Sequence, residues 1–373
     1  MSYIDLPLHN GHVPRWLFSR MVKLARCMFE VIVDEYGADV ILDRLADPLW
    51  FQGLACVLGF DWDSSGATTV TVAALRQALN RAELGLKVVG GKGKAALATI
   101  DTLDEIGDSL GLSHRTIEDL KRISRLSAKV DTCLLQDGYS IYHHAMFISS
   151  DAKWTIIQQG MNPSERLARR YHWSWRINNH VIEPHSGIQG VKIHEKVLNL
   201  TSQKSSQVHR AIVDLVKEKP TSMKRLIMSL RGQSSLARWI GLDDRPIAYR
   251  LREVSINWQA LERAYEIQPK NMEELLLVRG IGPGTLRALA LVAELIYGCE
   301  LDWQDPLRYA YAFGGKDGVP YPVNRERMDF VIEFLKDAIE NAKLGDKERL
   351  LALRRLKGLV KKLGHAYYLV RLA

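Results

Sequence analysis

Ionisable side chains crowd the segment 127–186, and three of them have the types needed for cleavage of a sugar–base bond. Lys129, Asp131 and Asp137 are the candidates. A lysine whose pKa is lowered by burial can attack a sugar C1′ as an amine, and a carboxylate beside it can transfer protons. Lys129 and Asp131 share a face on a strand but not on a helix. We predict that these three residues are catalytic; the alternative for Lys129 is a surface ion pair.

The same segment carries side chains that recognise bases. A glutamine amide can pair with a base edge, and an aromatic ring can stack on an extruded or single-stranded base. Adjacent glutamines on a strand point to opposite faces, so only one can enter a given pocket. The alternative for the aromatic residues is a place in the core. The predicted base pocket consists of Gln158, Gln159, Tyr139, His144 and Tyr171.

Metal ligation has weaker support in the sequence. The adjacent His143 and His144 would lie on opposite faces of a strand, and no recognised ligand spacing links the other acids and histidines. We predict neither a metal nor another cofactor. A metal-dependent nuclease is the alternative, with Asp61, Asp63, Asp137 or Glu183 as ligands, and a less favoured site would combine His144, Asp137, Glu183 and His185.

A glycine-rich turn, Arg279-Gly280-Ile281-Gly282-Pro283-Gly284-Thr285, lies between two stretches of apolar helical periodicity. We call residues 279–285 the glycine turn. Glycine permits positive φ and a close approach of the backbone to a ligand, and Pro283 suits the first turn of a helix. The free N–H groups of a helix N-terminus favour a phosphate oxygen. The predicted DNA-backbone contacts are therefore Arg279, Gly280, Gly282, Gly284 and Thr285.

The stretch 273–297 resembles the helix-hairpin-helix of DNA repair enzymes and polymerase accessory domains. In the glycosylases with this motif, the resemblance implies an aspartate entering the next helix and, in bifunctional members, a lysine on the hairpin. This sequence has no lysine between Asn271 and Lys316, and its downstream acids are Asp302 and Asp305. Asp305 is equally suited to capping a helix. We therefore expect the hairpin to hold the phosphate backbone and the chemistry to lie in residues 127–186.

Further basic residues extend the expected DNA surface. Lys92 and Lys94 lie in an expected glycine loop at 90–94, and Lys316 lies in an expected tight turn. The 90–94 loop lacks the Gly-x-x-x-x-Gly-Lys-Ser/Thr order of a nucleotide-hydrolase phosphate loop. Beyond Asn341, lysine and arginine far outnumber acids, which predicts a basic helical tail. Such a tail either follows a DNA backbone without reading sequence or is a solvated helix face.

The elements expected around these residues define an α+β fold. We predict helices from Pro14 to Gly37, across 38–60 with a break at Asp47-Pro48, and across 72–84 and 99–126, a strand at 86–89, a β-hairpin formed by 139–148 and 154–159, and a helix beginning at 162–164. Beyond residues 199–206 the pattern is helical. The predicted organisation is a mixed α/β domain at 1–200, followed by an all-α domain at 201–373 that contains the helix-hairpin-helix at 273–297.

The composition is that of an ordinary globular protein. The 373 residues are 47% hydrophobic and 25% charged, with a net charge of +8 and a pI near 9.2. Such a charge is compatible with a polyanion partner. No membrane span or signal peptide is indicated, so we expect a cytoplasmic protein. The cysteines are scattered, without the spacing of a zinc or disulfide site.

Motifs along nearly the whole chain resemble the uncharacterised archaeal and bacterial family DUF763. They include LPLHNG, GFDWDSSGATT, GGKGKA, SRLSAKVD, WTIIQQGMN, ARRYHW and FGGKDGVPYPVNR. The resemblance implies no firm activity, but the pairing with a helix-hairpin-helix points to DNA repair or processing. Our leading hypothesis is a DNA glycosylase with lyase activity that binds duplex DNA. The alternatives are a metal-dependent nuclease and a non-enzymatic DNA-binding accessory protein.

Overall fold

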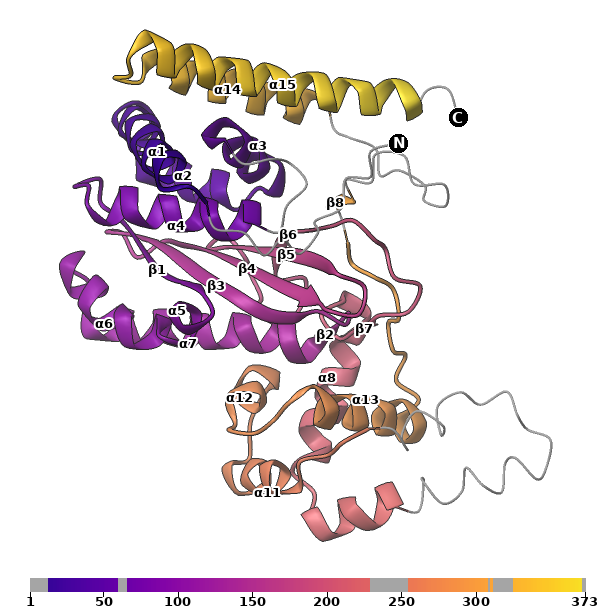
Figure 1. Cartoon of the computed structure of the whole chain (residues 1–373). Coiled ribbons are helices and arrows are strands. Elements are labelled where there is room, and N and C mark those ends of the chain that lie inside the picture. The colour runs from indigo at the N-terminus through magenta and orange to yellow at the C-terminus, as the bar shows by residue number, and fades with distance from the viewer. Residues whose placement is uncertain (1–12, 60–65, 229–253, 308, 311–324, 371–373) are drawn as a thin grey trace.

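A mixed β-sheet lies at the centre of the molecule, with helices on both faces (Figure 1). The computed structural model describes residues 13–59, 66–228, 254–307, 309–310 and 325–370. The strand order is β1-β3-β4-β5-β6-β8, antiparallel except for the β6–β8 pair. Its strands are β1 (Leu86–Lys92), β3 (Ser140–Ser149), β4 (Trp154–Asn162), β5 (Leu167–Ser174), β6 (His185–Gly190) and β8 (Tyr309–Ala310). A separate small pair joins β2 (Leu135–Gln136) to β7 (Leu198–Asn199).

Two layers of helices cover one face of the sheet. The Asp47 side chain caps the third helix by accepting from the N–H of Leu49 at 2.9 Å, which accounts for the break predicted there. The inner layer is α1 (Arg15–Tyr36), α2 (Ala38–Leu45), α3 (Pro48–Leu58) and α4 (Gly66–Asn80). The outer layer is α14 (Arg325–Asn341) and α15 (Asp346–Val370). Both layers share one hydrophobic core with β1, β3 and β4.

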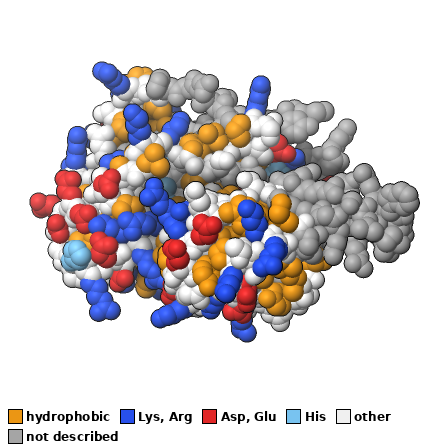
Figure 2. All heavy atoms as spheres, turned by 90° about the horizontal axis from the view of Figure 1, so that it is seen from below, with side chains coloured by type: hydrophobic (Ala, Val, Ile, Leu, Met, Phe, Trp, Pro, Cys, Tyr) orange, Lys and Arg blue, Asp and Glu red, His pale blue; other side chains and the backbone are white. Residues whose placement is uncertain are grey.

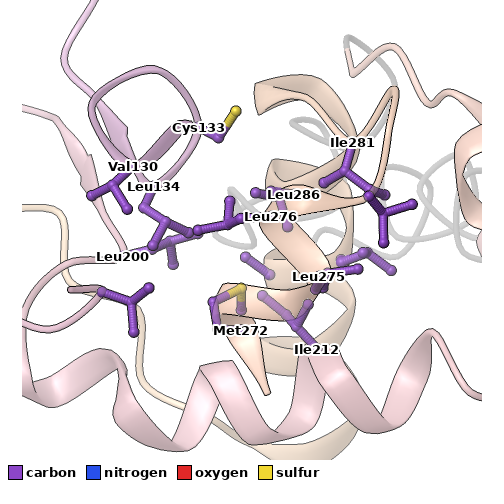
Figure 3. Packing of buried hydrophobic residues seen from close by; sticks show 14 of the residues in the cluster. Val130, Cys133, Leu134, Leu200, Ile212, Met272, Leu275, Leu276, Ile281 and Leu286 are labelled. Atoms are coloured by element: carbon purple, nitrogen blue, oxygen red, sulfur yellow. The ribbon is translucent and has the colours of Figure 1, made fainter. Parts of the chain in front are cut away.

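The opposite face carries the helices that lead to the glycine turn. α7 (His114–Lys129) continues directly into a π-helix, η1 (Val130–Leu134), and the Ser113 side chain caps the start of α7. Ile281 and Leu286 pack with Val130 and Leu134 in a second core, so the turn is anchored on η1 (Figure 3). The remaining elements on this side are α5 (Lys94–Leu97), α6 (Thr99–Ser109), η2 (Gln203–Ser205), α8 (Ser206–Leu215), α11 (Trp258–Ile267), α12 (Met272–Leu277) and α13 (Pro283–Tyr297).

The mixed α/β class and the β-hairpin of β3 and β4 are confirmed, and two local predictions are wrong. The helix expected to begin at 162–164 does not form, because 167–174 is strand β5. Both faces of β5 are buried, and its arginines and histidine, residue types that usually lie at the surface, are in the interior. The glycine loop expected at 90–94 is strand as far as Lys92, and a Cβ on Gly90 would lie 2.2 Å from the carbonyl oxygen of His144.

Helices from the second half of the chain lie on both sides of the sheet. Those between 206 and 297 pack beneath α7 and η1, whereas α14 and α15 pack on α1 and α3. A division into two domains at residue 200 stays a prediction. None of the described helices combines the length and the apolar character that crossing a membrane requires.

Candidate functional sites: the glycine turn and a buried histidine–aspartate network

Side chains from three elements hold the backbone carbonyl groups of the glycine turn. Lys129 Nζ donates to the Ile281 oxygen at 2.7 Å, and Gln136 Nε2 donates to the Pro283 oxygen at 2.9 Å. Arg263 Nε and Asn257 Nδ2 donate to the oxygens of Arg279 and Gly280, at 3.0 and 3.2 Å. Two of these four donors are cations, and charge-assisted bonds are the stronger kind. The carbonyl side of the turn is thus occupied by the protein itself.

The amide side of the turn is left open. Among the described residues, none accepts a hydrogen bond from the N–H of Gly280, Gly282, Gly284 or Thr285. Gly282 is the N-cap of α13, without a side-chain cap, and Pro283 is at the first helical position. Gly280 and Pro283 are exposed. The turn therefore presents N–H groups at a helix N-terminus, which is the arrangement that binds an anion.

The three glycines of the turn have different structural requirements. Gly280 has φ +92, and a Cβ there would lie 2.7 Å from Arg263 Nη2. A Cβ on Gly284 would lie 2.3 Å from the Ser255 carbonyl oxygen. Gly282 is extended, at φ −138 and ψ 177, and a Cβ there would meet no atom within 4 Å. The fold therefore requires glycine at two of these positions, and Gly282 is the one where the fold leaves room for a ligand.

Charge is unevenly distributed on the face that carries the turn. Figure 2 views the molecule from this side and shows acidic side chains gathered at the end where α6 lies, with lysine and arginine side chains spaced across the rest. Asp101, Asp104, Glu105 and Asp108 of α6 are exposed acids at that end. Arg279 is exposed at the turn itself. A group of exposed acids thus lies at the α6 end of this face, and an exposed cation lies at the turn.

Asp131 is the centre of a buried polar network between η1 and the sheet. Its carboxylate accepts from Gln158 Nε2 at 2.5 Å, Trp173 Nε1 at 3.0 Å and His185 Nε2 at 2.5 Å. Gln158 in turn accepts from His144 Nδ1 at 2.9 Å. Asp131 is fully buried, and the π-helix is the element that places it against the sheet. Such helices are rare and often occur at functional sites.

The hydrogen bonds of this network fix the histidine tautomers. Because His144 donates from Nδ1, its neutral ring accepts at Nε2 from the Ser124 hydroxyl, 2.8 Å away. Burial lowers the pKa of His144, in keeping with a neutral ring. His185 donates from Nε2, so its neutral form leaves Nδ1 as an acceptor with no partner among the described residues. An oriented imidazole with a free acceptor nitrogen is the arrangement of a general base.

Asp137 belongs to a second, neighbouring network. It accepts from Tyr171 Oη at 2.7 Å and forms an ion pair with Arg169 at 3.0 Å. Arg169 also binds both carboxylate oxygens of Asp305, at 3.0 and 2.7 Å. Burial raises the pKa of Asp137, against the opposing effects of Arg169 and Tyr171. Asp305 does not begin a helix. Its bonds to Arg169 attach the segment 301–307 to β5.

A further polar cluster lies on the face of the sheet that the inner layer, α1 to α4, covers. Arg170 donates to Gln52 at 3.0 Å, Thr68 at 3.2 Å and His172 Nε2 at 2.9 Å. His172 Nδ1 lies 2.8 Å from the Leu45 oxygen, so this ring is neutral as well, and burial lowers its pKa well below the usual value. His143 is fully buried beside this cluster, and neither of its ring nitrogens has a hydrogen-bond partner among the described residues.

The structure brings some predicted site residues together and separates others. Asp131, Gln158 and His144 meet in one network, and Asp137 and Tyr171 meet in the second. Lys129 joins neither and binds the glycine turn instead. Gln159 lies on the opposite face of β4 and bonds to Tyr142, and Tyr139 is buried beneath Arg169. Lys92 and Lys94 are exposed, and Lys316, Asp61 and Asp63 lie outside the described residues.

Metal ligands do not converge in the described part of the chain. No group of three His, Cys, Asp or Glu side chains is placed there to hold an ion. The set His144, Asp137, Glu183 and His185 is divided, because Asp137 pairs with Arg169 and His144 with Ser124 and Gln158.

Residues 2–323 match the model of a protein family described as a protein of unknown function, DUF763. The chain belongs to the DUF763 family. Comparison of this DUF763 protein with curated proteins and with solved structures found no match.

Four residues important in these networks were absent from the sequence predictions: Ser124, Arg169, Asn257 and Arg263. Ser124 and Arg169 lie in the motifs SRLSAKVD and ARRYHW but were given no role, and their partners His144 and Asp137 are 20 and 32 residues away. Asn257 and Arg263 lie one helix before the turn, where the sequence shows an ordinary capping asparagine and a surface arginine.

Proposed function

We propose that this DUF763 protein binds duplex DNA through its phosphate backbone at the glycine turn and acts in DNA repair or processing. The observation that carries the proposal is the asymmetry of the turn: the protein's own side chains occupy its carbonyl groups, while the amides of Gly280, Gly282, Gly284 and Thr285 have no acceptor among the described residues. A phosphate oxygen supplies what those amides lack. The resemblance to the helix-hairpin-helix and the basic pI support DNA as the source of that phosphate.

The backbone contact is tested by the salt dependence of binding. Arg279→Gln removes the exposed cation at the turn. We expect weaker binding to every duplex sequence and a salt slope reduced by about 1. The matched control is Lys336→Gln, an exposed cation on α14. Equal slopes for the wild type and Arg279→Gln, measured by fluorescence anisotropy at several salt concentrations, would remove Arg279 and the turn from the interface.

A second candidate function is excision of a base. In this proposal His185 and Asp131, and not Lys129, are the catalytic pair. The observation that favours it is the 2.5 Å hydrogen bond from His185 Nε2 to Asp131, which leaves Nδ1 as the acceptor. In this proposal Nδ1 takes a proton from water, the water oxygen bonds to the sugar C1′, and the glycosidic bond breaks with its electron pair leaving on the base. No covalent enzyme intermediate forms. Asp131 orients His185 and stabilises its positive charge.

Incubation with duplexes that carry assorted base lesions separates the enzymatic alternatives. Hydrolytic excision predicts alkali-labile sites that form in EDTA and no borohydride-trapped adduct. His185→Gln keeps a donor for Asp131 but lacks the acceptor nitrogen, so it should lose product formation and retain duplex binding. A trapped adduct would instead support a lyase, and cutting abolished by EDTA would support a metal-dependent nuclease. Duplex binding without any product would leave a non-enzymatic accessory protein.

A further inference from the structure

A basic groove runs across the surface formed by α1, α4, the end of β1 and α15, on the face of the sheet opposite the glycine turn. It consists of three cavities of about 490, 390 and 190 Å³. The first two share Gln77 and Arg81, and the first and third share Lys23. The three cavities are therefore neighbours on the surface. We call them together the basic groove.

The charge of the basic groove is almost entirely of one sign. Among its described lining residues, Glu348 is the only acid, and it pairs with Lys23 at 3.0 Å. Arg15, Arg81 and Lys92 are exposed and have no carboxylate partner among the described residues. Exposed cations without counter-ions, aligned along a groove, attract a polyanion more strongly than the same charges scattered over a surface.

An exposed aromatic side chain, Trp16, lies beside two residues that line the basic groove, Arg15 and Arg20. Trp16 is 61% exposed, next to Arg15 at the start of α1, and the Arg20 guanidinium lies 5.4 Å from the centre of its ring. A large aromatic residue this exposed gains little from the fold. An exposed indole beside a cation can stack on a base while the cation contacts the adjoining phosphate.

We propose that the basic groove binds a single strand of nucleic acid. The bases of a duplex are paired inside the helix and cannot stack on Trp16, whereas those of a single strand can. The two larger cavities also have volumes in the range of about 300–1,000 Å³ that accommodates small ligands, so each has room for a nucleotide unit. Rows of cations with an aromatic platform are the usual means of binding single strands without sequence preference.

Combined with the proposed function, on which this step rests, the basic groove gives the protein two DNA contacts of different kinds. The glycine turn holds a duplex backbone on one face of the sheet, and the groove holds a single strand on the other. The substrate class that satisfies both is a duplex with a single-stranded extension. We expect such a tailed duplex to bind more tightly than either a blunt duplex or a free single strand.

Anisotropy with a labelled oligo-dT longer than the ~4–16 nucleotides that such a site covers tests the basic groove directly. The triple variant Arg15→Gln, Arg81→Gln, Lys92→Gln should lower the salt slope by about 2, at ~0.7 per lost phosphate contact. Trp16→Ala should weaken binding about tenfold, and Trp16→Phe should restore most of it. The control triple Arg115→Gln, Arg210→Gln, Lys336→Gln removes exposed cations on α7, α8 and α14 and should have a smaller effect.

Several outcomes would overturn the proposal. One is unchanged oligo-dT affinity in the groove triple, and another is an equal loss of oligo-dT affinity in the groove triple and the control triple. The third is binding of the wild type to phosphatidylserine vesicles but not to oligonucleotides. A duplex probe separates this failure from failure of the proposed function. Groove variants should leave blunt-duplex affinity within about twofold. If duplex binding is absent while the groove variants still weaken oligo-dT binding, the basic groove stands and the glycine turn does not.

Discussion

The ammonium group of Lys129 donates to the carbonyl oxygen of Ile281 at 2.7 Å, so the last residue of α7 holds the glycine turn in place. The lysine predicted as a nucleophile thus binds the glycine turn, the proposed DNA contact. Lys129→Met should destabilise the fold by about 1.5 kcal/mol, because the backbone oxygen of Ile281 loses its charged hydrogen-bond donor. It should also weaken duplex binding, and Lys129→Arg should retain both properties.

Urea unfolding and duplex anisotropy measure these two effects of Lys129. The opposite pattern is full duplex affinity in Lys129→Met together with loss of a borohydride-trapped adduct seen in the wild type. That pattern would return Lys129 to a nucleophilic role.

The glycines of the turn should differ in their effect on stability. Gly280→Ala places a side chain at φ +92 and against Arg263, which should cost about 1–3 kcal/mol. Gly282→Ala adds a methyl group to an extended residue with open space around it, and should change the free energy of unfolding by less than about 0.5 kcal/mol. Equal destabilisation of the two variants in thermal unfolding would show that the turn has another conformation.

The ion pair between Arg169 and its two carboxylates should be essential to the fold. Burial disfavours the Arg169 charge, but Asp137 and Asp305 outweigh that effect and raise its pKa above the ordinary value. Arg169→Met leaves two buried carboxylates without a counter-charge and should cost about 3–5 kcal/mol. Thermal unfolding measures the loss. Stability within 1 kcal/mol of the wild type would mean that the Asp137 network is open to solvent.

Acid should destabilise the protein through its buried histidines. Burial lowers the pKa of His143 to about 3 and of His209 to about 4, from 6.5 in the unfolded chain. Between pH 6.5 and 4 the unfolded state therefore binds more protons, so the stability present above pH 6.5 is lost as the pH falls. Each histidine contributes on the order of 1.4 kcal/mol per pH unit in this window.

His143→Leu isolates one histidine of this set. The ring has no hydrogen-bond partner among the described residues, so its removal should keep or raise stability at pH 7 and make the dependence on pH shallower. A melting temperature that is constant from pH 7 to 4, or an unchanged slope in His143→Leu, would contradict the neutral buried state of these rings.

Local sequence signals were sufficient to predict the elements that are determined by residues close together in the chain. The helix break at Asp47-Pro48 and the hairpin of β3 and β4 each depend on residues a few positions apart, and each lies where it was predicted. Strand β5 was missed although residues 170–174 alternate polar and aromatic side chains, because Arg170 and His172 are buried and residues of these types usually lie at a surface.

The candidate sites were predicted in part, for the same physical reason. Strand alternation correctly placed His143 and His144, and Gln158 and Gln159, on opposite faces. Asp131 lies in its network because it is on a π-helix, and no sequence pattern predicts such a helix. The contact of Lys129 with Ile281 was not predicted, because it spans 152 residues of sequence. Long-range contacts of this kind follow from the fold and not from local spacing.

The most direct test of phosphate binding at the glycine turn is duplex affinity in Gly282→Val, compared with the control Gly345→Val. A Cβ at either position meets no atom within 4 Å, so both variants should fold. The valine at 282 would occupy the space in front of the free amides and should weaken binding at least about tenfold for every duplex sequence, with Gly345→Val unchanged. Wild-type affinity in a folded Gly282→Val would contradict the account.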